Sequence, residues 1–348
     1  MSRNKQDNSK INAWIRILAA GIAVSLLVGG LYLLLSEKPE GDSGEMLLDL
    51  ILGAEEGLVT APVWVAESKG YFLEEGLNIE IIGFDSGKAS LASMLINQDI
   101  DISTAAQTPI VFHSFSRNDF VIIAAMNFSD NDVKVLARKE SAIASPSDLT
   151  GKKVGITMGS TGQFFLDLFL THNGVLYSEV ETIDIAPSEL SQALIDGRVD
   201  AIVTWEPHIL NAMNQLGQEA LLLPSEGLYR VDFYFATNKD TAQNNPEALK
   251  RFLEAIHVAE QFISENEEEA MDIVSERFGL DRESTALIWR DFSFQLILDQ
   301  SILRSLEDEA RWAIRSNLVD ESDVPNYLNF MYLDALEEVK PEAVTIIR

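Results

Sequence analysis

The stretch KVGITMGSTGQF, residues 153–164, decides how this chain folds. Residues 154–157 form a short apolar run with β-branched ends, which predicts a strand, and an apolar pattern of helical period begins at Phe164. At such a strand–turn–helix junction the first backbone N–H groups of the helix lack partners, and the positive end of its dipole points outward. We therefore expect the residues of the turn to hold an anion or a polar head group: Gly159, Ser160, Thr161 and Gly162.

A second strand end follows at residues 205–208. The expected strand 200–204 comes after a helix at 190–196 and closes on the sequence WEPH. Polar and aromatic groups at two strand ends of an α/β sheet mark the place where a small ligand binds. The face of Trp205 and the carboxylate of Glu206 are suited to hold an ammonium group by a cation–π contact and a salt bridge. The alternative is a turn in which Trp205 packs inside and Glu206 faces water.

Composition narrows the classes of function. The chain has 348 residues, 47% of them hydrophobic, which is enough for about two lobes. Its formal net charge of −29 would repel nucleic acid and anionic lipid surfaces. It contains no cysteine, which excludes disulfides, thiol catalysis and zinc–thiolate sites.

The N-terminal region carries a candidate membrane anchor. Residues 17–35 are 19 residues without a charge, and as a helix they would be about 28 Å long, close to the thickness of a bilayer's hydrocarbon core. Basic residues precede this run and mostly acidic residues follow it, so the remainder of the chain should lie outside the cytoplasm. We expect a cytoplasmic tail at 1–12, a transmembrane signal anchor at 13–36 and a linker at 37–45. A cleaved signal peptide is the alternative.

From residue 47 onward, strand and helix patterns alternate, which predicts largely parallel sheets covered on both faces. The expected strands are 47–52, 77–84, 100–104, 121–126, 133–138, 154–157, 180–185, 201–204, 220–223 and 231–237. Among the expected helices are 62–69, 90–97, 247–266, 268–278, 282–292, 302–317 and 326–336.

Three segments together resemble a known family. They are GYFLEEGLNIEIIGFDSGKASLASMLINQDIDISTAAQTP (70–109), SPSDLTGKKVGITMGSTGQ (145–163) and LSQALIDGRVDAIVTWEPH (190–208). They resemble the extracytoplasmic solute-binding proteins of ABC importers for sulfonates, taurine, nitrate and thiamine precursors. The resemblance implies an α/β, two-lobe periplasmic-binding-protein (type II) clamp with two hinge crossings, here preceded by the transmembrane helix. Lobe 1 would combine 46–133 with 235–348, and lobe 2 would span 134–234.

In such a clamp the solute lies between helix N-termini of the two lobes. Candidates from lobe 1 follow its strands: Glu55, Ser86, Gly87, Lys88, Gln107, Thr108 and Ser129, with Asp232 near the return crossing. Helix capping alone is the alternative for the serines and threonines. If acidic residues line the cleft, the site suits a zwitterion or a cation better than a plain sulfonate or nitrate. Phe84, Phe128, Phe233 and Tyr234 are candidate walls, or else core residues.

These observations favour a protein without chemistry of its own, which delivers a solute to the permease and ATPase subunits of an importer. The solute could be a sulfonate, a taurine-like zwitterion, nitrate or an amine. The sequence shows no phosphate loop, no GxSxG elbow and no paired histidine spacing, so we expect neither cofactor nor metal. Two alternatives remain open: a pyrimidine-precursor-synthesising enzyme of the same fold, whose cysteine-rich motif is absent here, and a ligand-sensing subunit at the membrane.

Overall fold

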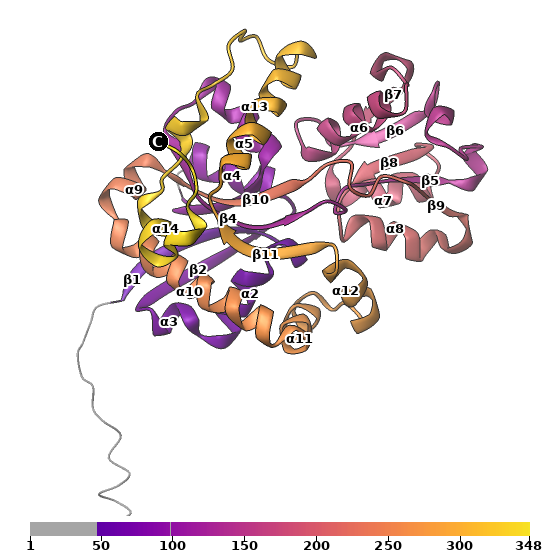
Figure 1. The fold of residues 1–348 in the computed structure, drawn as a ribbon. Helices are drawn as coiled ribbons and strands as arrows, with labels where there is room; N and C mark the ends of the chain where they lie inside the picture. The colour runs from indigo at the N-terminus through magenta and orange to yellow at the C-terminus, as the bar shows by residue number, and fades with distance from the viewer. Residues whose placement is uncertain (1–46, 98) are drawn as a thin grey trace, which may run out of the picture. The chain divides into compact units, whose positions relative to one another are not determined.

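The computed structural model describes residues 47–97 and 99–348 (Figure 1). The expected cytoplasmic tail, transmembrane anchor and linker all lie outside these described residues. Within them, no helix is both long enough and apolar enough to cross a membrane.

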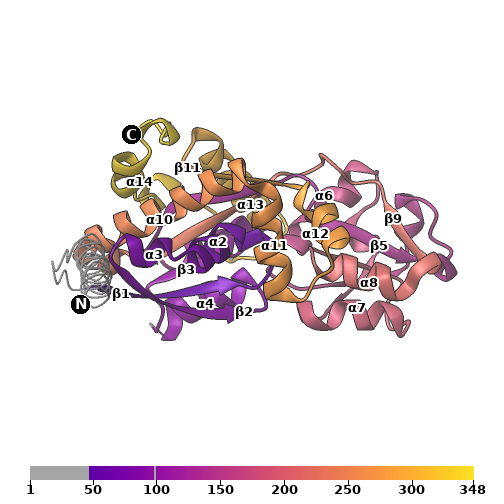
Figure 2. The ribbon, with the colours of Figure 1, turned by 90° about the horizontal axis from the view of Figure 1, so that it is seen from below.

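Two sheets form the framework, and we call the parts built on them lobe 1 and lobe 2 (Figures 1 and 2). The sheet of lobe 1 has six strands in the order β11 (Phe292–Ile297), β4 (Phe120–Ser129), β10 (Val231–Asn238), β3 (Ile102–Ala106), β1 (Leu48–Glu55) and β2 (Leu77–Phe84). The sheet of lobe 2 has five, in the order β7 (Glu181–Asp184), β6 (Lys153–Ile156), β8 (Ala201–Thr204), β5 (Lys134–Arg138) and β9 (Ala220–Leu223).

The chain passes between the sheets at two crossings, residues 130–133 and residues 224–230. The first crossing joins β4 to β5, and the second joins β9 to β10. These two short connections carry the chain from one sheet to the other, as a hinge requires. The expected lobe boundaries at 133/134 and 234/235 stay a prediction.

The sheets are mixed rather than largely parallel, so that part of the prediction was wrong. In lobe 1, β1 pairs in parallel with β2 and β3, whereas β10 runs antiparallel to β3 and β4, and β11 runs antiparallel to β4. In lobe 2, β6 is parallel to β7 and β8, and β5 is antiparallel to β8 and β9. The reversal of β5 and β10 follows from the crossings, because each of these strands enters its sheet from the other lobe.

This topology directs strand ends and helix starts toward the crossings. Strands β1 to β4 run in one direction in lobe 1, and β6 to β9 run in one direction in lobe 2, so their carboxyl ends lie at the edges where the chain changes sheets. Helices α4 (Gly87–Asn97), α5 (Gln107–Ser116), α6 (Thr161–His172) and α8 (His208–Leu216) begin directly after such ends. Carboxyl ends of strands are the usual place for a ligand in α/β folds.

Alternation along the strands of lobe 2 builds a core on each face of its sheet. Val135 and Val203 belong to the core under α6, whereas Leu136 and Ile202 belong to the core under α7 (Pro187–Ile195) and α8. Figure 1 accordingly shows α6 on one side of the sheet and α7 and α8 on the other. Helices therefore pack on both faces of the sheet, and this packing fixes where α6 and α8 begin, after the carboxyl ends of β6 and β8.

Lobe 1 has one continuous core that holds helices from both halves of the chain. Helix α10 (Pro246–Glu265) packs on α2 (Ala61–Lys69), α3 (Tyr71–Glu74), α11 (Glu267–Phe278) and α14 (Asp334–Val339), while α13 (Gln300–Arg315) packs on α5. Two shorter helices, α9 (Lys239–Asn244) and α12 (Arg282–Trp289), complete the described set of α-helices in this lobe.

Two helices expected near the C-terminus were wrong in extent. The expected helix 282–292 ends at Trp289, and strand β11 follows at Phe292. The expected helix 326–336 is a short 3-10 turn at Tyr327–Phe330 followed, after a break, by α14. The strand forms because β4 offers an open edge on which Phe292 and Phe294 pair with Ser129 and Asn127, a partner far away in the sequence.

Candidate functional site

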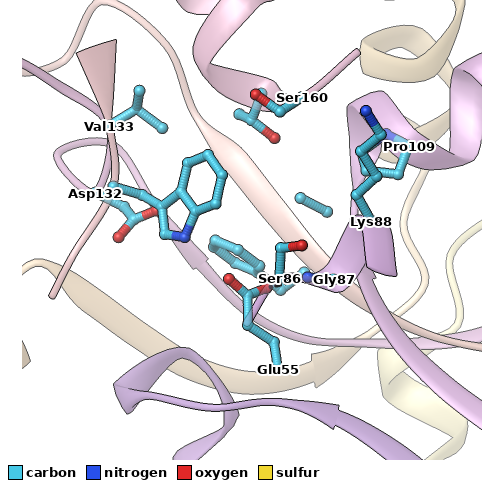
Figure 3. Close-up of a pocket in the computed structure, with 12 residues that line it drawn as sticks. Glu55, Ser86, Gly87, Lys88, Pro109, Asp132, Val133 and Ser160 are labelled. Carbon is cyan, nitrogen blue, oxygen red and sulfur yellow. Dashed lines mark hydrogen bonds between the residues drawn. The ribbon is translucent and has the colours of Figure 1, made fainter. Parts of the chain in front are cut away.

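A pocket lies between the two lobes, where the strand ends and helix starts meet (Figure 3). About 350 Å³ of space not filled by protein atoms, part of it continuous with solvent, lies within it. Figure 3 shows Glu55, Ser86 and Gly87 on one side of this space and Ser160 on the opposite side. The described residues that line it are Glu55, Ser86, Gly87, Lys88, Ala106, Pro109, Asp132, Val133, Ser160, Thr161, Trp205 and Phe233.

The pocket brings together half of the predicted ligand residues from both lobes: Glu55, Ser86, Gly87, Lys88, Ser160, Thr161 and Trp205. The other predicted residues do not line it: Gln107, Thr108, Ser129, Gly159, Gly162, Glu206 and Asp232. Sequence reasoning missed Asp132 and Val133, which belong to the first crossing, as well as Ala106 and Pro109 at the start of α5. Whether any of these residues contacts a ligand stays a prediction.

Glu55 occupies the N-terminus of α4. The backbone N–H of Gly87 donates to Glu55 Oε2 at 3.0 Å, and that of Ala89 donates to Ser86 Oγ at 3.3 Å. Gly87 allows this approach, because a Cβ at this position would lie 2.8 Å from Ala105 Cα and 3.0 Å from Glu55 Oε2. A side chain of the protein itself therefore fills the position at which the start of α4 would hold an anion.

The Glu55 carboxyl is unusually basic. It is 6% exposed, and burial raises its pKa to about 7, with the nearby charge of Asp85 adding to the rise. Hydrogen bonds from the Gly87 amide and from Trp205 lower the pKa by less. At neutral pH this carboxyl is thus poised between its neutral and its charged form.

Asp132, in the first crossing, is a second buried carboxylate on the pocket. It is 3% exposed, and burial raises its pKa well above the usual value, with the charges of Glu206 and Glu55 adding to the rise while Lys134 opposes it. The Glu206 N–H donates to Asp132 Oδ1 at 3.3 Å. No donor among the described residues hydrogen-bonds Oδ2.

Lys88 connects the two lobes across the pocket. Its side chain is exposed, and its Nζ donates to the carbonyl of Met158 in lobe 2 at 2.6 Å. The neighbouring Gly159 has φ +68°, and a Cβ there would lie 3.3 Å from Lys88 Nζ. Gly159 is therefore part of the turn that receives the lysine rather than of the pocket lining.

Ser160 caps α6. Its Oγ accepts from the Gly162 N–H at 3.2 Å and donates to the Thr157 carbonyl at 2.6 Å. The Gly159 N–H donates to Gln163 Oε1 at 2.7 Å, and a Cβ on Gly162 would lie 3.0 Å from the Val203 carbonyl oxygen. The start of α6 thus satisfies much of its own hydrogen bonding, as in the capping alternative.

Glu206 does not line the pocket and forms an ion pair with Lys134. Its Oε1 lies 2.9 Å from Lys134 Nζ, which lies 3.0 Å from Asp291 Oδ2 of lobe 1. Its Oε2 accepts from the Leu210 N–H at 2.9 Å, at the start of α8. Burial alone would lower the pKa of Lys134, but Glu206 and Asp291 raise it overall. The pairing of Trp205 with Glu206 around an amine stays a prediction. The carboxylates that line the pocket are those of Glu55 and Asp132.

Gln107 and Asp232 lie behind the pocket, at the second crossing. Gln107 Oε1 accepts from the Asp232 N–H at 2.7 Å and from the Tyr229 hydroxyl at 3.0 Å. Arg230 Nη2 lies 2.7 Å from Asp232 Oδ1. Burial raises the pKa of Asp232 to about 6, although the Arg230 charge opposes this. These contacts hold the crossing against the start of α5.

A buried glutamate completes this network, which we call the crossing network: Gln107, Thr108, Tyr229, Asp232 and Glu309. Glu309 of α13 accepts from the Thr108 hydroxyl at 2.7 Å and from the Tyr229 hydroxyl at 2.6 Å. Burial raises the pKa of Glu309 to about 7. Sequence reasoning missed Glu309, since it sits in a helix whose neighbouring residues read as an ordinary charged surface.

The remaining candidates lie in the framework. Ser129 is buried and accepts from the Asn131 N–H at 3.2 Å, next to the first crossing. Of the four candidate aromatic walls, Phe233 lines the pocket. Phe128 instead packs beneath the Arg230 guanidinium, whose Cζ lies 3.8 Å from the ring centroid, and Tyr234 is fully buried.

Solved structures share this two-lobe α/β architecture and show that the chain has the periplasmic binding protein fold. The periplasmic aliphatic sulphonate binding protein SsuA from Escherichia coli matches with a TM-score of 0.70 at 18% identity, over 82% of this chain and 97% of that one. The periplasmic nitrate-binding protein NrtA from Synechocystis PCC 6803 matches with a TM-score of 0.66 at 18% identity, over 85% of this chain and 89% of that one.

The sequence defines the family. The profile of the family described as NMT1/THI5 like matches residues 58–270, and the chain belongs to this family. A Bacillus subtilis (strain 168) protein whose name assigns it to aliphatic sulfonates is 25% identical, over 90% of this chain and 96% of its own length. The taurine-binding periplasmic protein of Escherichia coli (strain K12) is 27% identical, over 58% of this chain and 62% of its own length.

Proposed function

We propose that this protein is the solute-binding component of an ABC importer and captures a small polar organic solute between its two lobes. The observation that carries the proposal is the pocket itself, which takes its lining from both lobes at the starts of α4 and α6. Relatives and structures of the same fold are named for sulfonates, taurine and nitrate. The role needs no chemistry, only capture and release.

The same geometry supports a mechanism of capture by closure. The lobes are joined by two short crossings, so a rotation about them opens and closes the pocket. A solute that contacts Ser86 of lobe 1 and Ser160 of lobe 2 interacts with both only when the lobes are closed. It therefore shifts the population toward the closed form, which a permease can recognise.

Location and partners follow from the same role. The permease and ATPase subunits of an importer are the expected protein partners, and the binding domain would lie on the extracytoplasmic, periplasmic side. The uncharged run at residues 17–35 supports a single-pass anchor in the cell membrane. The formal charge of −29 argues against nucleic acid as a partner.

Ligand-induced stabilisation tests the proposal. Taurine, ethanesulfonate, nitrate and an aminopyrimidine are added singly to the full-length protein, and the melting temperature is measured. A ligand at about 100 times its Kd adds about 2.7 kcal/mol to the free energy of unfolding, so at least one solute should raise the melting temperature.

A pocket-filling variant, Thr161→Trp, serves as the control. Thr161 lines the pocket at the start of α6, so the larger side chain should abolish the ligand effect while circular dichroism stays that of the parent. A panel in which no solute raises the melting temperature, or a shift that persists in the filled variant, contradicts solute capture at this site.

A further inference from the structure

The charges on the pocket are unevenly divided. Among the described residues that line it, three side chains are ionisable: Glu55, Asp132 and Lys88. Both carboxylates are buried, whereas the lysine is exposed. Its Nζ already donates to the Met158 carbonyl at 2.6 Å. The buried part of the pocket therefore holds two acidic groups, and Lys134, whose charge acts on Asp132, is itself paired with Glu206 and Asp291.

Two of the backbone donors that would hold an anion are already engaged. The Gly87 N–H at the start of α4 donates to Glu55, and the Gly162 N–H at the start of α6 donates to Ser160. An anionic ligand at α4 would have to displace the Glu55 carboxylate and would then lie beside it. Two like charges in one buried site oppose each other's ionisation and raise the free energy of the pair.

Features that favour a cation converge on the same space. Asp132 Oδ2 has no hydrogen-bond donor among the described residues, and the charge of Glu55 acts on Asp132. Trp205 lines the pocket between the two lobes, 8% exposed. A positively charged nitrogen there would pair with the carboxylates and contact the indole face.

The rest of the lining combines apolar residues with three hydroxyl side chains, Ser86, Ser160 and Thr161, and the apolar part would contact the remainder of the solute. Val133, Pro109 and Phe233 make up part of this lining, and Figure 3 shows Asp132 and Val133 on one flank of the space and Pro109 and Lys88 on the other. This arrangement suits a compact organic molecule with one charged end and an apolar or planar body.

From this geometry we propose that the pocket selects organic solutes bearing a positively charged nitrogen, held by Glu55 and Asp132 against Trp205, over solutes whose only charge is a sulfonate. The inference rests on the proposed function, since it assigns a ligand class to the same pocket. The ligand class proposed here differs from the sulfonates and nitrate for which several relatives are named.

A matched series of probes tests the charge preference. Benzylamine, benzyl alcohol and benzenesulfonate share one ring and present a cation, a neutral group and an anion, and taurine presents both charges. Each is titrated by calorimetry into the full-length protein, with calcium chloride as the inorganic-cation arm. Benzylamine should bind at least about tenfold more tightly than benzyl alcohol, and benzenesulfonate should bind most weakly.

Substitutions locate the effect. Glu55→Gln and Asp132→Asn remove charge while keeping shape, and each should weaken benzylamine by about tenfold or more while leaving benzyl alcohol within about twofold. Glu56→Gln is the matched control, because Glu56 is exposed and does not line the pocket. Circular dichroism and the melting temperature of each variant establish that it is folded.

The outcomes distinguish this inference from the proposed function. Tighter binding of benzenesulfonate than of benzylamine, unchanged by Glu55→Gln, overturns the charge preference and leaves solute capture intact. Binding of calcium in place of benzylamine also overturns it. If no probe of any charge binds, and native mass spectrometry of the purified protein finds no bound organic molecule, both the charge preference and the proposed function fail.

Discussion

Glu309 shows how a single buried acid makes stability depend on pH. In the unfolded chain this carboxyl loses its proton near its ordinary pKa of 4.5, whereas in the folded protein burial raises its pKa to about 7. Between these values the folded state binds more protons than the unfolded state, so the free energy of unfolding falls as the pH rises. Glu55 and Asp232, with pKa values raised to about 7 and about 6, act in the same direction.

We therefore predict that Glu309→Gln flattens the pH dependence of stability. The wild-type protein should lose stability from about pH 5 to about pH 8, and Glu309 should account for up to about 3 kcal/mol of that loss. Urea unfolding at several pH values measures this. Asp308→Asn, an exposed change one residue away, should keep the wild-type slope, and an unchanged slope in Glu309→Gln would contradict the prediction.

At the residue scale, sequence reasoning found the positions that directly end a strand or begin a helix. Glu55, Ser86 and Ser160 line the pocket, and they could be predicted because each stands at the end of a strand or the start of a helix that the local sequence pattern reveals. Asp132 is different, since its position depends on where the crossing carries the chain. It stands in a short acidic run, DND at 130–132, which gives no sign that it will be buried.

At the scale of one element, the question at the start of α6 is whether Ser160 only caps the helix or also contacts the solute. Ser160 accepts from the Gly162 N–H, as an N-cap does, donates to the Thr157 carbonyl, and also lines the pocket. We predict that Ser160→Ala lowers the free energy of unfolding by about 1 kcal/mol, since one cap is lost. If Ser160 also contacts the solute, the same variant should weaken binding by more than this loss of stability explains.

Asp299→Ala provides the comparison. Asp299 caps α13 through hydrogen bonds from the Ser301 and Ile302 N–H groups and does not line the pocket. It should cost similar stability and leave the Kd unchanged. Equal affinities of the two variants, measured by calorimetry for the same solute, would restrict Ser160 to capping.

Elements with a strong local pattern were predicted well. Strand β2 matches its expected range, α10 differs from its expected range by one residue at each end, and α11 differs by one residue at its start. The elements that were predicted wrongly share a cause, because their structure depends on partners far away in the sequence. Strand β11 carries the alternating sequence FSFQLI but follows directly on a helical pattern, so only its pairing with β4 reveals it. The direction of β10 likewise follows from the crossing.

At the scale of the whole molecule, several side-chain contacts join the lobes in addition to the two crossings. Trp312 of α13 donates from Nε1 to Asp167 Oδ2 of α6 at 2.7 Å, and its ring lies 5.0 Å from that of Phe164. Lys134 and Asp291 form a second link, and Lys88 with the Met158 carbonyl forms a third. These contacts hold the two lobes in the arrangement seen here, which the proposed mechanism identifies with the closed form.

We predict that Trp312→Phe shifts the ligand-free protein toward an open form. The change keeps an aromatic ring but removes the donor to Asp167, so the closed form loses about 1 kcal/mol. Small-angle X-ray scattering should show a larger radius of gyration without solute and the wild-type value with it. Trp289→Phe, a change buried within lobe 1, should alter neither. Identical scattering of wild type and Trp312→Phe would exclude this contact as a latch.

The contact between Glu55 and Gly87 bears on how such a protein diverges from its relatives. Because an acidic group from strand β1 accepts from the first amide of α4, the proposed preference for a positively charged solute would depend on this one residue. Replacement of that acid by a small neutral residue would unmask the amide, and an ancestor or descendant could exchange one nutrient class for another without rebuilding its scaffold.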